Sequence, residues 1–198
     1  MTAHHANGGA DDTITLPITA SDLPIYGSNL TINGAGSYNL FLGGTNDTVN
    51  LTGGNETVTA YFGHNTINLS GGNNLVQIGG TGNVITAGKG DNTIWDIGSG
   101  NTYVLPTAGT GTDTIWAGIG GIIDTLDLQP LLAKTNWNGN TAALGNFLEV
   151  VSPTTGAENG GDAVLMARNT VHQAWSAVAV FKDCGGLTLS NVLAHATT

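Results

Sequence analysis

The side chains that could do chemistry in this chain recur every nine residues. Aspartate, glutamate or asparagine occupies seven equally spaced positions, which are Asp47, Glu56, Asn65, Asn74, Asn83, Asn92 and Asn101. Their oxygen atoms could coordinate a hard cation, and a net charge of -10 is compatible with one. The amides could instead hydrogen-bond to one another in ladders that need no metal. Because the interior of the series is asparagine, we expect its interior to be metal-free and the acids at its ends to be the candidate ligands.

Residues that should point outward form a second group of candidates. Trp95 and Trp116 are expected to stack on neighbouring coils of one face, where paired indoles form a platform for a sugar ring. Thr48 and Thr66 belong to ranks of threonine and asparagine that resemble the surfaces of ice-binding β-solenoids. Two competing interpretations stay open: the segment after the repeats covers the tryptophans, or threonine is present because it favours strands.

A short repeat must position these side chains. From residue 43 to 105 the chain reads GGTNDTVNL, TGGNETVTA, YFGHNTINL, SGGNNLVQI, GGTGNVITA, GKGDNTIWD and IGSGNTYVL. Each unit carries an apolar, outward, apolar triplet that alternates like a half-buried strand, and glycines form the turns between triplets. One such unit cannot bury a face alone, but stacked units can. The pattern predicts an all-β fold, a parallel β-roll or β-solenoid of nonapeptide repeats with two units per coil.

Three regions follow from this pattern. Residues 1–42 are predicted to be an N-terminal lead and cap with less regular opening rungs, and residues 43–118 the β-roll, of about four coils. The register slips by three after Tyr103 and resumes at Asp113 and again at Asp124. Residues 119–198 are predicted to be a mainly-β capping domain with its own small core, which contains a short helix at DLQPLLAK and strands at NFLEVVS, DAVLMAR and SAVAVFK.

Composition argues against several classes of function. With only Lys89, Lys134, Arg168 and Lys182 as basic residues, the chain is a poor partner for nucleic acid. No run is apolar enough to span a bilayer, and no cleavable N-terminal signal is present. The single cysteine, Cys184, is read as a small buried hydrophobe. We expect no catalysis, because the repeat brings no histidine or arginine near its acids. A polysaccharide-modifying enzyme, or an accessory module of one, is the remaining enzymatic alternative.

The nonapeptide pattern resembles the repeats-in-toxin (RTX) β-roll. The tail, with DTLDLQPLL, LGNFLEVV, DAVLM and LTLSNVLA, resembles the C-terminal target domain of proteins exported by bacterial type I secretion. The resemblance implies a protein that is secreted without an N-terminal signal through the type I secretion machinery and folds outside the cell. It also implies calcium in the turns. Since the family's aspartate is replaced by asparagine in the central repeats, calcium is expected only at Asp47, Asp91, Asp113, Asp124 and Asp127.

These observations favour a secreted or cell-surface, non-catalytic and calcium-associated protein. The first hypothesis is a structural or adhesive role through self-association in an extracellular matrix. The second is recognition of an extracellular glycan or of ice through one flat face that bears threonine, asparagine and tryptophan. Self-assembly requires exposed apolar area at the ends of the solenoid. Recognition requires uncovered tryptophans or an unbroken rank of threonine and asparagine.

Overall fold

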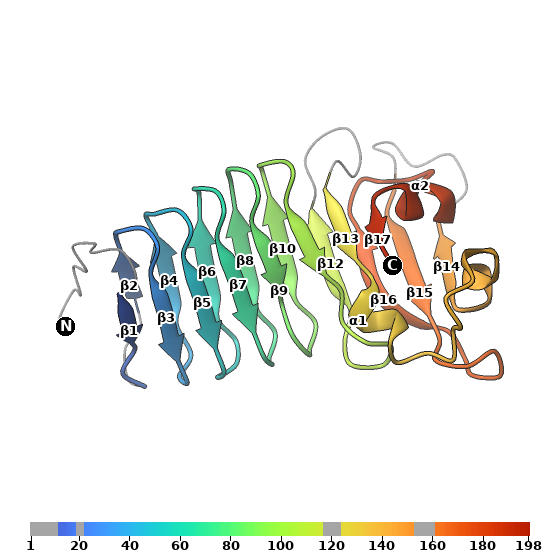
Figure 1. The fold of residues 1–198 in the computed structure, drawn as a ribbon, viewed down its shortest axis with the longest axis horizontal. Helices are drawn as coiled ribbons and strands as arrows, with labels where there is room; N and C mark the ends of the chain where they lie inside the picture. The colour runs from blue at the N-terminus through green and yellow to red at the C-terminus, as the bar shows by residue number, and fades with distance from the viewer. Residues whose placement is uncertain (1–11, 19–21, 117–123, 153–160) are drawn as a thin grey trace.

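The computed structural model describes residues 12–18, 22–116, 124–152 and 161–198 of the chain. They form a parallel β-solenoid of about 6 turns, each of ~18 residues, followed by a region that contains antiparallel strands (Figure 1). The predicted fold class is therefore confirmed. Of the predicted lead and cap over residues 1–42, residues 1–11 and 19–21 lie outside the described part of the chain.

Two sheets face each other across the solenoid. Sheet A has eight strands in the order β1-β3-β5-β7-β9-β11-β13-β17. Its strands are β1 (Thr13–Thr15), β3 (Thr31–Gly34), β5 (Thr48–Leu51), β7 (Thr66–Leu69), β9 (Val84–Thr86), β11 (Thr102–Val104), β13 (Thr125–Asp127) and β17 (Ala196–Thr197).

Sheet B has nine strands in the order β14-β15-β16-β12-β10-β8-β6-β4-β2. Its solenoid strands are β2 (Asp22–Ile25), β4 (Asn39–Leu42), β6 (Thr57–Ala60), β8 (Leu75–Ile78), β10 (Thr93–Asp96) and β12 (Asp113–Trp116). The C-terminal region adds β16 (Ser176–Phe181), β15 (Ala163–Ala167) and β14 (Leu148–Val151). Every pair in the solenoid is parallel, whereas the pairs β16–β15 and β15–β14 are antiparallel.

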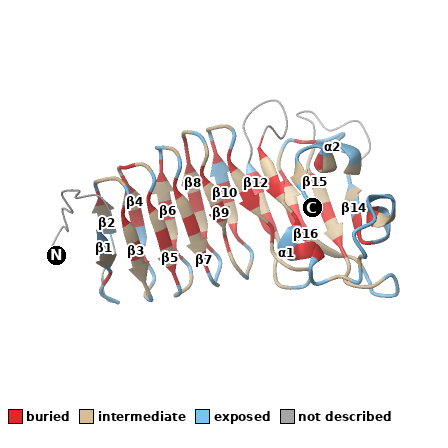
Figure 2. Ribbon diagram, in the orientation of Figure 1, coloured by how far each residue is buried: buried red, intermediate tan, exposed pale blue. Residues whose placement is uncertain are grey.

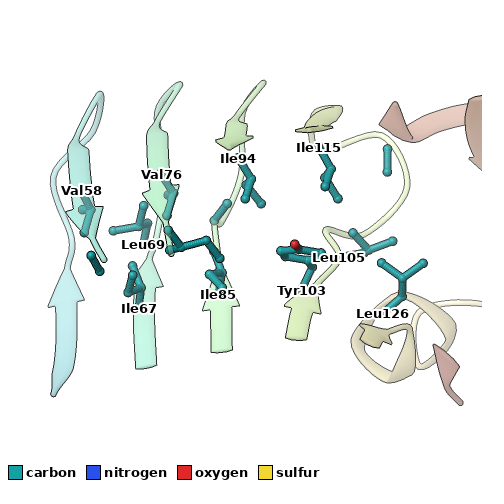
Figure 3. Close-up of a cluster of buried hydrophobic side chains, with 14 of the residues drawn as sticks. Val58, Ile67, Leu69, Val76, Ile85, Ile94, Tyr103, Leu105, Ile115 and Leu126 are labelled. Carbon is teal, nitrogen blue, oxygen red and sulfur yellow. The ribbon is translucent and has the colours of Figure 1, made fainter. Parts of the chain in front are cut away.

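The apolar triplets build the core. In each strand the side chains alternate between the interior and the surface, so Val49 and Leu51 are buried while Thr48 and Asn50 are not (Figure 2). Figure 3 shows the inward side chains of both sheets meeting between them, from Val58 and Ile67 to Ile115 and Leu126. Short strands therefore bury an apolar face by stacking on their neighbours.

The solenoid is longer than the repeat predicts. About four coils were expected, and about 6 are present, because Thr13–Thr15 already pairs in register with β3 and the ladders continue to Asp127. The predicted slip after Tyr103 is confirmed: Thr93 pairs with Thr114 and Thr102 with Thr125. A longer loop changes the sequence spacing between coils without changing the stacking of the strands.

The turns bring successive coils into close contact. Asn46, Asn55 and His64 take the left-handed conformation, with φ of 59°, 62° and 61°. A Cβ atom on Gly44 would lie 1.4 Å from the carbonyl oxygen of Gly27 in the preceding coil, so only glycine fits there. At this position of the turn, glycine is thus required by backbone-to-backbone packing between coils.

The C-terminal region continues the solenoid core. It contains α1 (Gln129–Leu132), the 3-10 helix η1 (Thr141–Asn146) and α2 (Leu189–Ala194), which begins with a capping box at Thr188. The expected helix and three strands are confirmed. Among the described residues, the predicted core of its own is not found, since one buried cluster runs from Leu16 to Val192. Among the described helices, none is long and apolar enough to cross a membrane.

Candidate functional site

Two ladders of polar side chains run inside the solenoid, one at the start of each sheet's strands. Inner ladder A contains Asp47, Asn65, Asn83, Asn101 and Asp124, and inner ladder B contains Glu56, Asn74, Asn92 and Asp113. All of these side chains are buried. In both ladders, each asparagine oxygen accepts the backbone N–H of the ladder residue one coil earlier; the N–H of Asn65, for example, donates to Oδ1 of Asn83 at 2.9 Å.

The Nδ2 group of each amide explains why asparagine is required. Nδ2 of Asn83 donates to the carbonyl of Gly79 at 3.0 Å and to Oδ1 of Asn101 at 3.1 Å. Nδ2 of Asn74 donates to the carbonyls of Gly71 and Ala87, both at 3.1 Å. A carboxylate has no proton to donate to these carbonyls. The predicted amide-to-amide bonds are confirmed, and backbone groups are bonded as well.

Aspartates end both ladders at the C-terminal side of the solenoid. Oδ1 of Asp113 accepts from Nδ2 of Asn92 at 2.7 Å, and Oδ1 of Asp124 accepts from the N–H of Asn101 at 2.8 Å. Burial raises the pKa of Asp113 to about 7, although hydrogen bonds from Asn92 oppose the rise. Burial also raises the pKa of Asp124.

Asp96 forms a buried cluster with Tyr103 and Asp124. The Tyr103 hydroxyl lies 2.9 Å from Oδ2 of Asp124 and also contacts Oδ2 of Asp96. One phenolic proton cannot serve two carboxylates, so one contact requires a proton on an aspartate. Burial and both aspartates raise the pKa of Tyr103, which keeps the phenol protonated. Sequence reasoning did not place Asp96 inside the solenoid. Its place two residues after the buried Ile94 is the signal that it points inward.

Glu56 begins inner ladder B and differs from the residues above it. Both of its carboxyl oxygens are buried and make no hydrogen bond with the described residues. Burial raises the pKa of Glu56, because the neutral acid is less costly to bury than the carboxylate. Burial of Glu56 therefore lowers the stability of the ladder at neutral pH.

The five predicted metal ligands do not converge. Asp47, Asp113 and Asp124 are buried in different coils, and each accepts at least one hydrogen bond from the chain. Asp91 is exposed, and its Oδ1 accepts from the N–H of Thr112. Oδ1 of Asp127 accepts from the N–H of Gln129 and from the hydroxyl of Thr197. In the described ranges, no group of three or more histidine, cysteine, aspartate or glutamate residues could hold a metal ion. These carboxylates therefore do not assemble a calcium ligand set with one another, and calcium dependence stays a prediction.

The outer face of sheet A, called face A, carries two regular columns of side chains. The first column is Thr13, Thr31, Thr48, Thr66, Val84, Thr102 and Thr125. The second is Thr15, Asn33, Asn50, Asn68, Thr86, Val104 and Asp127. Asn68 donates to Oδ1 of Asn50 at 2.9 Å, and Asn50 donates to Oδ1 of Asn33 at 3.0 Å. Face A thus presents threonine and asparagine from β1 to β9, interrupted there only by Val84.

The outer face of sheet B, called face B, is irregular and bears aromatic rings. Trp95 and Trp116 pair across β10 and β12 with ring centroids 6.1 Å apart and planes tilted by 59°. They are 49% and 39% exposed, so the C-terminal region leaves both rings accessible. Lys182, which pairs with Asp162, lies over the Trp116 ring. The structure also brings together an aromatic row that the sequence did not reveal, which is Tyr26, Phe41 and Tyr61.

Comparison of the chain with protein-family models, with curated proteins and with solved structures gave no match. The β-solenoid architecture therefore stands on the structure itself. Membership of the RTX family and a type I secretion domain rest on the sequence patterns alone.

Proposed function

We propose that this chain is a non-catalytic β-solenoid that acts outside the cell and binds ice through face A. The observation that carries the proposal is the double column of threonine and asparagine from β1 to β9. Export from the cell is supported by the resemblance of the repeat and the tail to RTX proteins.

The geometry suits a ligand that repeats regularly. Neighbouring strands of a sheet are about 4.8 Å apart, and outward residues two positions apart along a strand are separated by about 6.7 Å. Face A therefore presents a two-dimensional lattice of hydroxyl, methyl and amide groups. The hydrogen bonds that join Asn33, Asn50 and Asn68 hold the amides in place before any ligand binds. An ordered lattice of water, which also repeats in two dimensions, is the ligand that such a surface matches.

The strand preference of threonine does not account for the regularity. If it did, both faces of the same solenoid would show it. At the positions that match the second column of face A, face B instead carries Pro24, Phe41, Thr59, Gln77, Trp95 and Trp116. The first column of face B still carries Asn39, Thr57, Thr93 and Thr114, so the two faces differ in the second column. A second column that is regular on face A and irregular on face B supports a binding role for face A.

Thermal hysteresis of ice growth tests the proposal. The native protein should show it, and Thr66→Tyr, which adds a bulky ring in the middle of face A, should lose most of it. Thr57→Tyr is the matched control, because Thr57 occupies the same strand position on face B with similar burial. Circular dichroism should show that both variants fold. No hysteresis in the native protein, or equal losses in the two variants, would refute the proposal. Retention on crystalline cellulose without hysteresis would show that the lattice is a polysaccharide instead.

A second candidate, adhesion to a glycan, is favoured by the exposed indoles of Trp95 and Trp116. Stacking of a sugar ring on Trp95 should quench tryptophan fluorescence. Trp95→Ala should abolish the quenching, whereas Phe62→Ala, which removes an equally exposed ring from a turn, should not. Quenching that survives Trp95→Ala would exclude this site.

Self-assembly through the ends of the solenoid is the third candidate and has less support. At the ends of sheet A, β1 has three residues and β17 has two. At one end of sheet B, Pro24 removes a backbone donor from β2. Short strands and proline at an edge disfavour pairing with a second chain.

A further inference from the structure

A small pocket lies at the end of face A where the regular columns stop. Its volume is about 220 Å³. Thr86 of β9 and Val104 of β11 line it from the sheet, and the loop after β11 and α1 contribute Pro106, Thr107 and Pro130. Lys89 lines it from the turn that follows β9. Most of the lining is apolar, and one cation is present.

We propose that this pocket binds a uronic acid residue, that is, a sugar ring that carries a carboxylate. This inference does not depend on ice binding by face A. The pocket shares Thr86 with the second column, but Lys89 and Val104 lie beyond the stretch from β1 to β9. Three features of the pocket support it, which are the charge of Lys89, the free hydroxyl of Thr86 and the apolar side chains of the lining.

Charge complementarity selects an anionic ligand. The chain has a net charge of -10 and four basic residues, and Lys89 is the only one within the repeats. Of the other three, Lys182 pairs with Asp162 and Arg168 lies over the ring of Trp175. The ammonium of Lys89, by contrast, is exposed and forms no ion pair or hydrogen bond with a described residue. A carboxylate is the group that would pair with it.

The other lining groups select a sugar ring rather than a bare carboxylate. The Thr86 hydroxyl makes no side-chain hydrogen bond within the described ranges, so it can bond a ligand hydroxyl. Thr110, also in the lining, donates its hydroxyl proton to the carbonyl of Thr107 and accepts from the Thr107 hydroxyl at 3.4 Å, which leaves one lone pair for a ligand donor. Val104, Pro106 and Pro130 supply apolar contacts for the C–H groups of the ring. The volume accommodates one ring.

Titration of the full chain by nuclear magnetic resonance with D-glucuronate, D-glucose and acetate tests the proposal. We expect shifts of the Thr86, Lys89 and Val104 amides with glucuronate, and binding at least about tenfold weaker for glucose, which lacks the charge pair. Lys89→Met should weaken glucuronate binding by a similar factor, and Val104→Trp should abolish it by filling the pocket. Lys134→Met, which removes an exposed lysine outside the pocket, is the control and should change nothing. A titration with tetragalacturonate tests whether the bound uronic acid is the end of a polymer or a free sugar acid. A polymer that continues along face A should also shift the amides of Thr66 and Asn68, whereas a free sugar acid should not.

Three results would overturn the proposal. The first is no shift of these amides with glucuronate. The second is binding of glucose as tight as that of glucuronate, which removes the role of Lys89. The third is binding of acetate as tight as that of glucuronate, which removes the role of the ring. Lys89→Met and Lys134→Met leave both columns of face A unchanged, so thermal hysteresis of these two variants reports on the ice proposal separately. Val104→Trp alters the second column and is left out of that comparison.

Discussion

The substitution Asn83→Ala tests whether the inner ladders hold the coils together. Asn83 is fully buried in the middle of ladder A. The substitution removes three hydrogen bonds, which are one accepted from the N–H of Asn65 and two donated to Gly79 and Asn101. Oδ1 of Asn101 keeps the N–H of Asn83 as a donor. The N–H of Asn65 and the carbonyl of Gly79 lose these partners inside the solenoid.

The expected loss of stability follows from these two groups. A buried polar group that loses its partner costs about 1–3 kcal/mol, so the free energy of unfolding should fall by about 4 kcal/mol. For a chain of this size, that corresponds to a decrease in melting temperature of about 10 °C. Thermal and denaturant unfolding followed by circular dichroism measure it.

Asn68→Ala is the matched control. Asn68 has the same side chain and lies in a neighbouring coil, but it faces outward and donates one hydrogen bond to Asn50 at 2.9 Å. Its loss should cost about 1 kcal/mol or less, because water can replace the partner. If the two variants were destabilised equally, the inner ladder would not be a principal source of stability and the reasoning would be refuted.

Three further predictions concern protonation, metal and export. Burial raises the pKa of Asp113 to about 7, so the folded state binds this proton more tightly than the unfolded state, whose pKa is about 3.9. The resulting stabilisation is fully present below the pKa of the unfolded state and is lost as pH rises through about 7. Melting curves from pH 4 to 8 should show this loss, and Asp113→Asn should reduce it. A melting temperature of the native protein that does not change over this range would contradict the prediction. Melting temperatures in EDTA and in millimolar calcium should agree, since the ladder oxygens already accept hydrogen bonds from the chain. A large rise of the melting temperature with calcium would show instead that the folded state binds the metal. A chain that ends at residue 121 should not be exported by a matched type I exporter, and its efficient export would show that the tail is not the signal.

The period of the sequence was sufficient for the repeat architecture. Strand alternation is a local property, so the apolar residues from Val49 to Tyr103 could be assigned to the interior before the structure was known. The nine-residue spacing likewise predicted which side chains stack, and the pairs Thr48–Thr66 and Trp95–Trp116 are in register as expected. The C-terminal strands were found for the same reason.

The sequence predicted opening rungs before the repeat, but it did not reveal their register with β3, the place of Asp96 or the end pocket. Asp96 meets Asp124 only because the longer loops shift the spacing between coils to values outside the repeat. Thr13 and Thr15 extend face A because β1 pairs with β3, although the nonapeptide is absent there.

The repeat therefore determined the direction of each side chain and its partner one coil away, since both depend on a few bonds along the strand. Tertiary structure decided which residues from loops of unequal length meet, as Lys89, Pro106 and Pro130 do in the pocket. The physical reason is that stacking of strands fixes only the positions within the sheets, while the path of a loop depends on what it packs against.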